Sequence, residues 1–231
     1  MSIRLEADWN RICVPRLGVA RLTSRAFGGE NLRPLWDELM QRATDDAAGS
    51  GMGMDLSIIA QLLGDKATGL AIQKDTLALQ SLYRSPCSGK PRLRVLALAA
   101  AMDIGGNTPL EFLLEGSGIE LATCYVVPGR PLPDPLPDHD VAIVIAPDGD
   151  MTREMLAMIE ALAPAWPRPL LNQPRAIANL DRDRLYRCLD SIAGLEIPAT
   201  AKLDRKSLTA IAADPARLTT HLEDGVFPLI V

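Results

Sequence analysis

The sequence predicts an α/β protein whose sheet is built mainly from parallel strands. Three nearly continuous apolar runs carry this prediction: Arg92–Ala100, Ile119–Val127 and Val141–Pro147. Such runs are typical of central parallel strands that helices cover on both faces. Pro169–Leu171 adds a fourth short strand, and a helix is expected over Met151–Trp166. This alternation of strands and helices predicts a doubly wound, Rossmann-like layer.

The first 90 residues are predicted to be mainly helical. Apolar residues recur at helical spacing from Asn31 to about Asp46 and again over residues 55–84. In the second segment Gly64-Asp65 separates two apolar stripes, which predicts a helical hairpin that resembles a single tetratricopeptide unit. The stretch Gly49–Gly53 has no preceding strand and no following Gly-Lys-Ser/Thr, so a flexible turn is expected.

Two stretches of the α/β part carry more local predictions. Thr108-Pro-Leu-Glu111 has the pattern of a capping box, which should open a helix that buries Phe112 and Leu113. The proline-rich stretch Pro128–Asp140 is incompatible with a helix or a central strand. A stiff surface connection is therefore expected there, with His139 exposed on it.

The composition argues against several classes of protein. A net charge of −5 disfavours binding to nucleic acids and to anionic membranes, which requires clustered Lys and Arg. The four cysteines are scattered without a CxxC pair, which indicates reduced thiols in a cytoplasmic protein. Two histidines are too few for the usual zinc site. Neither a signal peptide nor an apolar run long enough to cross a membrane is recognised.

Polar residues that follow the first predicted strand are candidate ligand contacts. These are Asp103, Asn107 and Thr108. Gly105-Gly106 would let a ligand approach the backbone, and the free N–H groups of the following helix would favour an anion. A glycine-rich connection before a capped helix explains the same residues without any ligand.

The stretch Trp166–Thr200 is predicted to join two domains. A strand leads into an Asn-Gln-Pro-Arg turn and then helices, and after Gly194 a strand over Ile197–Lys202 should begin a new unit. Open α/β sheets bind ligands at the carboxyl ends of their strands, so Asn172 and Arg175 are candidate substrate contacts. A turn-stabilising role for Asn172 is an equal alternative. No set of residues identifies a catalytic centre.

Motifs in this joint resemble the entry to an ATP-grasp protein. They are Asn172-Gln-Pro-Arg, Asp181-Arg-Asp-Arg-Leu and Gly194-Leu-Glu-Ile-Pro-Ala-Thr, in this order. ATP-grasp ligases such as glutathione synthetase and the ribosomal-protein glutamate ligases begin with a small α/β "pre-ATP-grasp" domain, and a strand then starts the ATP-binding half. The resemblance covers residues 92–231.

The resemblance implies a domain plan and a function. The plan is a helical region at 1–90, a pre-ATP-grasp domain at 91–190 and the incomplete start of an ATP-grasp lobe at 191–231. The function is the substrate-side portion of an ATP-dependent carboxylate–amine ligase, which would hold a small-molecule or peptide substrate. ATP and magnesium would bind to a C-terminal half after Val231, so this chain alone is expected to carry no cofactor and to be inactive.

A second hypothesis is a non-enzymatic protein-binding module. The helical hairpin would dock a partner through its apolar stripe, and the α/β layer would serve as a scaffold. Self-association into a homo-oligomer through the same stripe is a variant of this hypothesis. A large apolar patch on the folded hairpin would favour docking. A stripe that the α/β domain covers would instead remove the reason for proposing docking.

Overall fold

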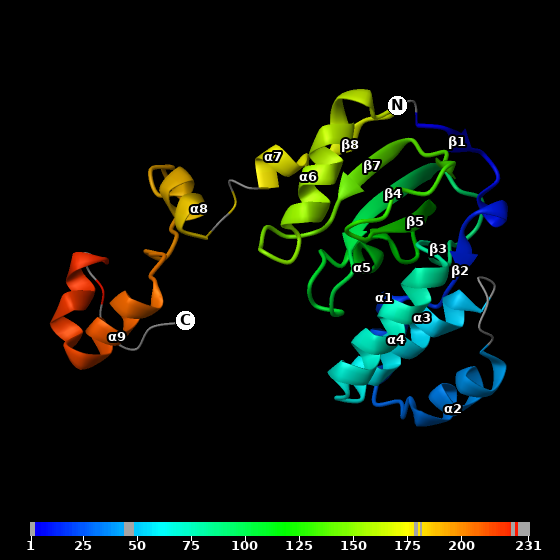
Figure 1. The fold of residues 1–231 in the computed structure, drawn as a ribbon, viewed down its shortest axis with the longest axis horizontal. Helices are drawn as coiled ribbons and strands as arrows, with labels where there is room; N and C mark the ends of the chain where they lie inside the picture. The colour runs from blue at the N-terminus through cyan, green and yellow to red at the C-terminus, as the bar shows by residue number, and fades with distance from the viewer. Residues whose placement is uncertain (1–2, 44–48, 178–179, 181, 223–224, 226–231) are drawn as a thin grey trace. The chain divides into compact units, whose positions relative to one another are not determined.

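The computed structural model describes residues 3–43, 49–177, 180, 182–222 and 225. It has a mixed α/β structure, and the chain forms two compact units, Met1–Pro174 and Arg175–Val231. All strands in the described part of the chain belong to the first unit. Figure 1 shows that this unit is a twisted sheet flanked by helices.

The central sheet has six strands in the order β2-β3-β5-β4-β7-β8. Their bounds are β2 Val14–Pro15, β3 Leu82–Arg84, β4 Leu93–Ala100, β5 Ile119–Val126, β7 Val141–Val144 and β8 Leu170–Leu171. β5, β4, β7 and β8 are parallel, whereas β3 is antiparallel to β5. β4 lies between two parallel neighbours and is buried from Val95 to Ala100. Each of the three predicted apolar runs, and the predicted fourth strand, therefore contains a strand of this one sheet.

In the described part of the chain, four α-helices precede β4. They are α1 Val19–Phe27, α2 Arg33–Arg42, α3 Ser50–Leu62 and α4 Lys66–Leu79. α3 and α4 form the predicted helical hairpin, which turns at Gly64 with a φ of +92°. The Asp65 carboxylate begins α4, because it accepts a hydrogen bond from the Thr68 N–H at 3.0 Å. Apolar side chains from α1, α3 and the α2 segment form one buried cluster: Leu22, Leu32, Leu39, Leu56, Ile58 and Ile59.

The prediction of a flexible turn at Gly49–Gly53 is wrong. Residues 50–53 form the first turn of α3, and two of its glycines are sites of close packing. A Cβ on Gly51 would lie 2.1 Å from the Pro15 carbonyl oxygen, and one on Gly53 would lie 2.5 Å from Thr76 Oγ1. These glycines therefore let α3 approach β2 and α4 more closely than larger residues would permit.

The predicted hairpin was expected to continue to Arg84, but α4 ends at Leu79 and Leu82–Arg84 forms β3. A strand of three residues is too short to show the alternation of apolar and polar residues that identifies a strand in a sequence. Its centre, Tyr83, is fully buried, and the phenol donates a hydrogen bond to the Gln80 carbonyl at 2.8 Å. Since β2 and β3 both join the central sheet, the helical region and the α/β layer share one compact unit.

The helix after β4 exposes the residues that were predicted to be buried. α5 spans Leu110–Leu114, and its Phe112 and Leu113 are 43% and 73% exposed. Leu110 and Leu114 instead pack against the buried side chains of β4 and β5. The helix is too short for the apolar pattern to specify which side faces the sheet.

The next helix, α6 Arg153–Leu162, lies within the predicted helical stretch Met151–Trp166, and its Leu156 and Ile159 are buried. A 3₁₀ turn, η2 Ala163–Ala165, leads from it toward β8. A further 3₁₀ turn, η1 Trp9–Arg11, lies near the start of the chain.

The proline-rich stretch between β5 and β7 is only partly a surface connection. Its segment β6 Leu136–Pro137 pairs in parallel with β1 Leu5–Glu6. The prediction that His139 is exposed is wrong, since only 2% of its surface is accessible. Its Nδ1 lies 2.7 Å from the Pro137 carbonyl, which can only accept, so Nδ1 carries the hydrogen. Nε2 then accepts a hydrogen bond from the Trp166 indole at 3.2 Å.

The second unit is helical in its described part. It contains α8 Arg182–Leu189, α9 Arg205–Ala213 and the 3₁₀ helix η3 Pro215–Thr220, and the short α7 Pro174–Ile177 spans the junction. The predicted strand over residues 197–202 is wrong, because this stretch is irregular. Asp181 of the second ATP-grasp-like motif and the end of the predicted 191–231 lobe, residues 226–231, lie outside the described residues.

Candidate functional site

Three of the predicted site residues follow β4 at the carboxyl edge of the parallel strands. Asn107 folds back on this strand: its Oδ1 accepts from the Ala100 N–H and its Nδ2 donates to the Ala100 carbonyl, each at 2.9 Å. The Thr108 N–H donates to the Ile145 carbonyl at 2.8 Å. Asn107 therefore stabilises the loop after β4, and both ends of its amide are already hydrogen bonded.

Asn172 lies at the same edge, directly after β8. Its backbone adopts a φ of +51°, a left-handed conformation that Asn tolerates better than most residues. Its Nδ2 donates to the Val144 carbonyl at 3.2 Å, at the end of β7. The structure therefore gives Asn172 the contacts of a turn-stabilising residue. Arg175 belongs to the second compact unit, whereas Asp103, Asn107, Thr108 and Asn172 belong to the first.

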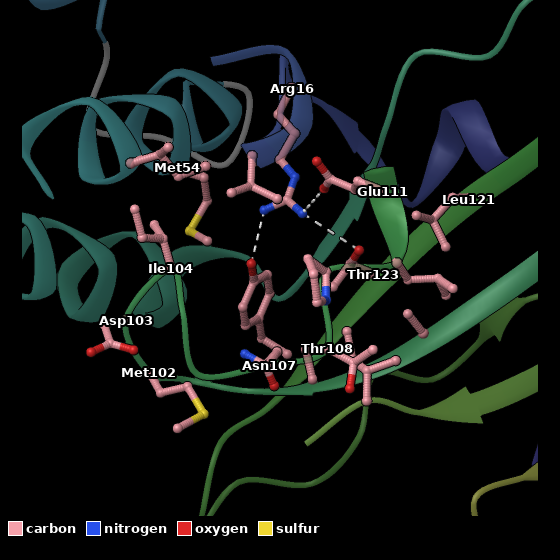
Figure 2. Close-up of a pocket in the computed structure, with 18 of the residues that line it drawn as sticks. Arg16, Met54, Met102, Asp103, Ile104, Asn107, Thr108, Glu111, Leu121 and Thr123 are labelled. Carbon is pink, nitrogen blue, oxygen red and sulfur yellow. Dashed lines mark hydrogen bonds and ion pairs between the residues drawn. The ribbon is translucent and has the colours of Figure 1, made fainter. Parts of the chain in front are cut away.

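A small pocket lies between this edge, α3 and β5. Its volume is about 60 Å³, enough for water molecules but small for a metabolite. Figure 2 shows the guanidinium of Arg16 entering it from one side, with Asn107 and Thr108 on the other. Arg16 donates to the Tyr125 hydroxyl at 2.9 Å and to the Glu111 carboxylate at 2.6 Å. Its side chain is only 3% exposed, so this is a buried ion pair.

Glu111 joins several segments around this pocket. Besides Arg16, it accepts hydrogen bonds from the Ala20 N–H in the first turn of α1 and from the Ser85 hydroxyl, each at 3.1 Å. The capping-box prediction is therefore wrong, because the carboxylate of Glu111 caps α1 rather than its own helix. A negative charge is favourable at that position, where the α1 N–H groups and the helix dipole point toward it.

Asp55 on α3 is the second buried carboxylate of this cluster. It accepts hydrogen bonds from the backbone N–H groups of Leu17 at 2.8 Å and Gly18 at 3.0 Å. Burial raises the pKa of Asp55, and these two hydrogen bonds oppose that shift. Asp55 and Glu111 thus hold the segment before α1 from two sides. We name Arg16, Asp55 and Glu111 the buried charge cluster.

A larger groove shares Gln73, Met102 and Asp103 with the small pocket. Its volume is about 620 Å³, within the usual range for sites that bind small molecules. α4 forms one wall, and the segments after β4, β5 and β7 provide the rest. The apolar residues that line it are Leu70, Leu77, Met102, Val127 and Met151. We name this opening the α4 groove.

Charged side chains of the α4 groove carry an excess of positive charge. Lys66, Lys74 and Arg130 line it together with one carboxylate, Asp103. Lys66 and Asp103 form an ion pair with each other. Arg130 donates to the carbonyls of Leu77 and Ala78 at 2.5 and 3.2 Å and so caps the C-terminal end of α4.

Lys74 differs from the other cations of the groove. It is exposed on α4 and makes no ion pair with any residue that the structure describes. The sequence analysis identified Asp103 but missed Lys66, Lys74 and Arg130. Two lysines eight residues apart on a helix are usually solvated surface residues, and no sequence pattern links them to Arg130, more than 50 positions away.

Metal-ligating and thiol side chains are scattered over the described residues. Within them, no group of three or more His, Cys, Asp or Glu side chains is placed to hold a metal ion. All four cysteines are free thiols, and burial raises the pKa of Cys13 and Cys124 to about 12, so neither would be a thiolate at neutral pH. In the same residues no helix has the length and apolar character required to cross a membrane.

Comparisons with known proteins gave no relative. No protein-family model, no curated protein and no solved structure matches this chain.

Proposed function

We propose that this chain is a substrate-holding α/β domain that binds a small organic molecule in the α4 groove. One observation carries the proposal: the groove of about 620 Å³ lies at the carboxyl edge of the parallel strands, where open α/β sheets bind ligands. Loops after three strands and one helix meet there. The chain alone offers no catalytic set within its described residues, so the role is binding rather than chemistry.

The ATP-grasp resemblance supplies a context for this role. A substrate-side domain of a carboxylate–amine ligase holds one reactant while another part of the enzyme binds ATP and magnesium. The parallel order β5-β4-β7-β8 fits the Rossmann-like domain that the resemblance implies. We therefore propose ligase substrate binding as the class, with ATP and magnesium bound outside residues 1–231.

The alternative of a protein-docking hairpin receives less support. Of the apolar stripe that motivated it, Leu56, Ile59 and Leu77 are buried inside the first unit. Leu63 and Leu79 remain 45% and 49% exposed; Leu63 lies at the turn between α3 and α4, and Leu79 is the last residue of α4. Single exposed apolar residues are common on protein surfaces and do not form a docking patch.

A matched pair of exposed alanines tests the proposed function. Ala78 lies on α4 at the groove and Ala161 lies on α6 away from it. A library of carboxylic, amino and neutral metabolites is screened by thermal shift against the wild type, Ala78→Trp and Ala161→Trp. The expected result is a set of stabilising compounds whose effect disappears in Ala78→Trp and persists in Ala161→Trp. Stabilisation by no compound, or equal stabilisation of both variants, would refute substrate binding in this groove.

A further inference from the structure

We infer that the α4 groove is specific for a small organic anion with an apolar body, whose charged group contacts Lys74. This inference rests on the proposed function and names its substrate class. The walls of the groove are mainly apolar, so a ligand gains by burying an apolar surface there. The charges at its edge then decide which polar group that ligand must carry.

The positive excess of the groove is local and opposes the charge of the whole protein. The chain carries a net charge of −5, whereas the groove has three cations and one carboxylate. The carboxylate is already neutralised by Lys66. An amine ligand would therefore meet no unpaired anion among the described lining residues, but it would meet Lys74.

The positions of the cations indicate where the anionic group binds. Arg130 has two of its nitrogens on the carbonyls at residues 77 and 78, the last turn of α4. Lys74 lies one helical turn before Ala78, and both Lys74 and Arg130 line the groove. Leu70 and Met151, which also line the groove, would contact the apolar body. A volume of about 620 Å³ suits a free small molecule rather than a peptide or a lipid bilayer.

Four probes separate charge from apolar contact: phenylbutyrate, its neutral amide phenylbutyramide, the cation phenylbutylamine, and acetate. Calorimetry with the whole chain is expected to detect phenylbutyrate. The other three should bind at least about tenfold more weakly. The amide and the amine lack the charge-assisted contact of the carboxylate, and acetate lacks the apolar contact. Lys74→Glu should lose phenylbutyrate binding by a similar factor. Lys90→Glu, the same charge change on an exposed residue outside the groove, should retain it.

Each outcome of this experiment bears on the inference. Equal or tighter binding of the amide or the amine would overturn anion specificity, but if Ala78→Trp abolishes it, the proposed function stands. Unchanged affinity in Lys74→Glu would overturn the assignment of Lys74. Failure of all four probes would overturn the inference, and the metabolite screen with Ala78→Trp would then show separately whether the proposed function also fails.

Discussion

The buried charge cluster and the α4 groove both adjoin the loop after β4, yet the charged side chains of the two regions lie in opposite environments. In the cluster, Arg16 and Glu111 are almost inaccessible, and Glu111 contacts three different segments. In the groove, Lys74 is exposed and has no ion-pair partner in the described part of the chain. A buried pair of charges must be hydrogen bonded to be tolerated, whereas an exposed cation is available to a ligand.

Charge alone therefore does not identify a binding site. The cluster contains the more unusual chemistry, including a buried arginine and a carboxylate with a raised pKa. Its hydrogen bonds, however, link the segment before α1 to α3, α5 and β5, and its pocket is small. We therefore assign the cluster to stability and the groove to binding. Substitutions in the two regions should separate these roles.

The largest effect is expected for Glu111→Gln. The substitution leaves Arg16 buried without a countercharge from α5, so the free energy of unfolding should fall by about 3–5 kcal/mol. Urea denaturation of the whole chain measures this change. Glu38→Gln is the control, because the exposed Glu38–Arg42 pair should contribute about 0.5 kcal/mol or less. Similar losses in both variants would contradict a special role for the buried pair.

A smaller loss is expected for Gly18→Ala. Gly18 has a φ of +88°, and a Cβ there would lie 2.5 Å from Glu111 Oε2. Backbone strain of about 1–3 kcal/mol is expected, and displacement of the Glu111 carboxylate adds to it. Gly29→Ala is the matched control, since Gly29 has a φ of +82° and no atom near its Cβ position. If the two variants unfold at the same urea concentration, the close contact with Glu111 does not contribute to the free energy of unfolding.

His139 should make stability depend on pH. Burial lowers the pKa of its imidazole below 6.5, and its hydrogen bonds to Pro137 and Trp166 fit the neutral ring. The unfolded chain therefore binds a proton at a higher pH than the folded chain, and the stability from this group is lost as pH falls below about 6.5. In a His221→Asn background, NMR titration should give His139 a pKa below 6.5. A value at or above 6.5 would contradict the buried neutral ring.

The sequence predicted the long, regular parts of the fold and missed the parts that depend on distant contacts. The apolar runs of β4 and β5 are mostly buried on both faces, and that of β7 alternates between half-buried and buried residues. Each run is visible in eight or fewer consecutive residues. β3 has only three residues, and it becomes a strand because β5 and β2 lie beside it. Helix periodicity nearby could not reveal that pairing.

The candidate site was predicted at the correct edge of the sheet but with different residues in the principal roles. Asn107 and Asn172 were proposed as ligand contacts, and both use their amides to hold backbone carbonyls at strand ends. The helical pattern of the fourteen-residue α4 gives no hint that Arg130 and Met151 will line the same groove as Lys74. Such a groove depends on how α4 packs against the sheet, which the sequence pattern does not encode locally.

The most direct test of the division between the two regions is a ¹⁵N NMR titration of the whole chain with phenylbutyrate. We predict that the largest amide shifts lie along the groove, at Leu70, Lys74, Ala78 and Met151. Amides that contact the buried charge cluster, Gly18 and Ala20, should stay unchanged. Shifts centred on Gly18 and Ala20, with none along α4, would contradict the assignment of binding to the groove and stability to the cluster.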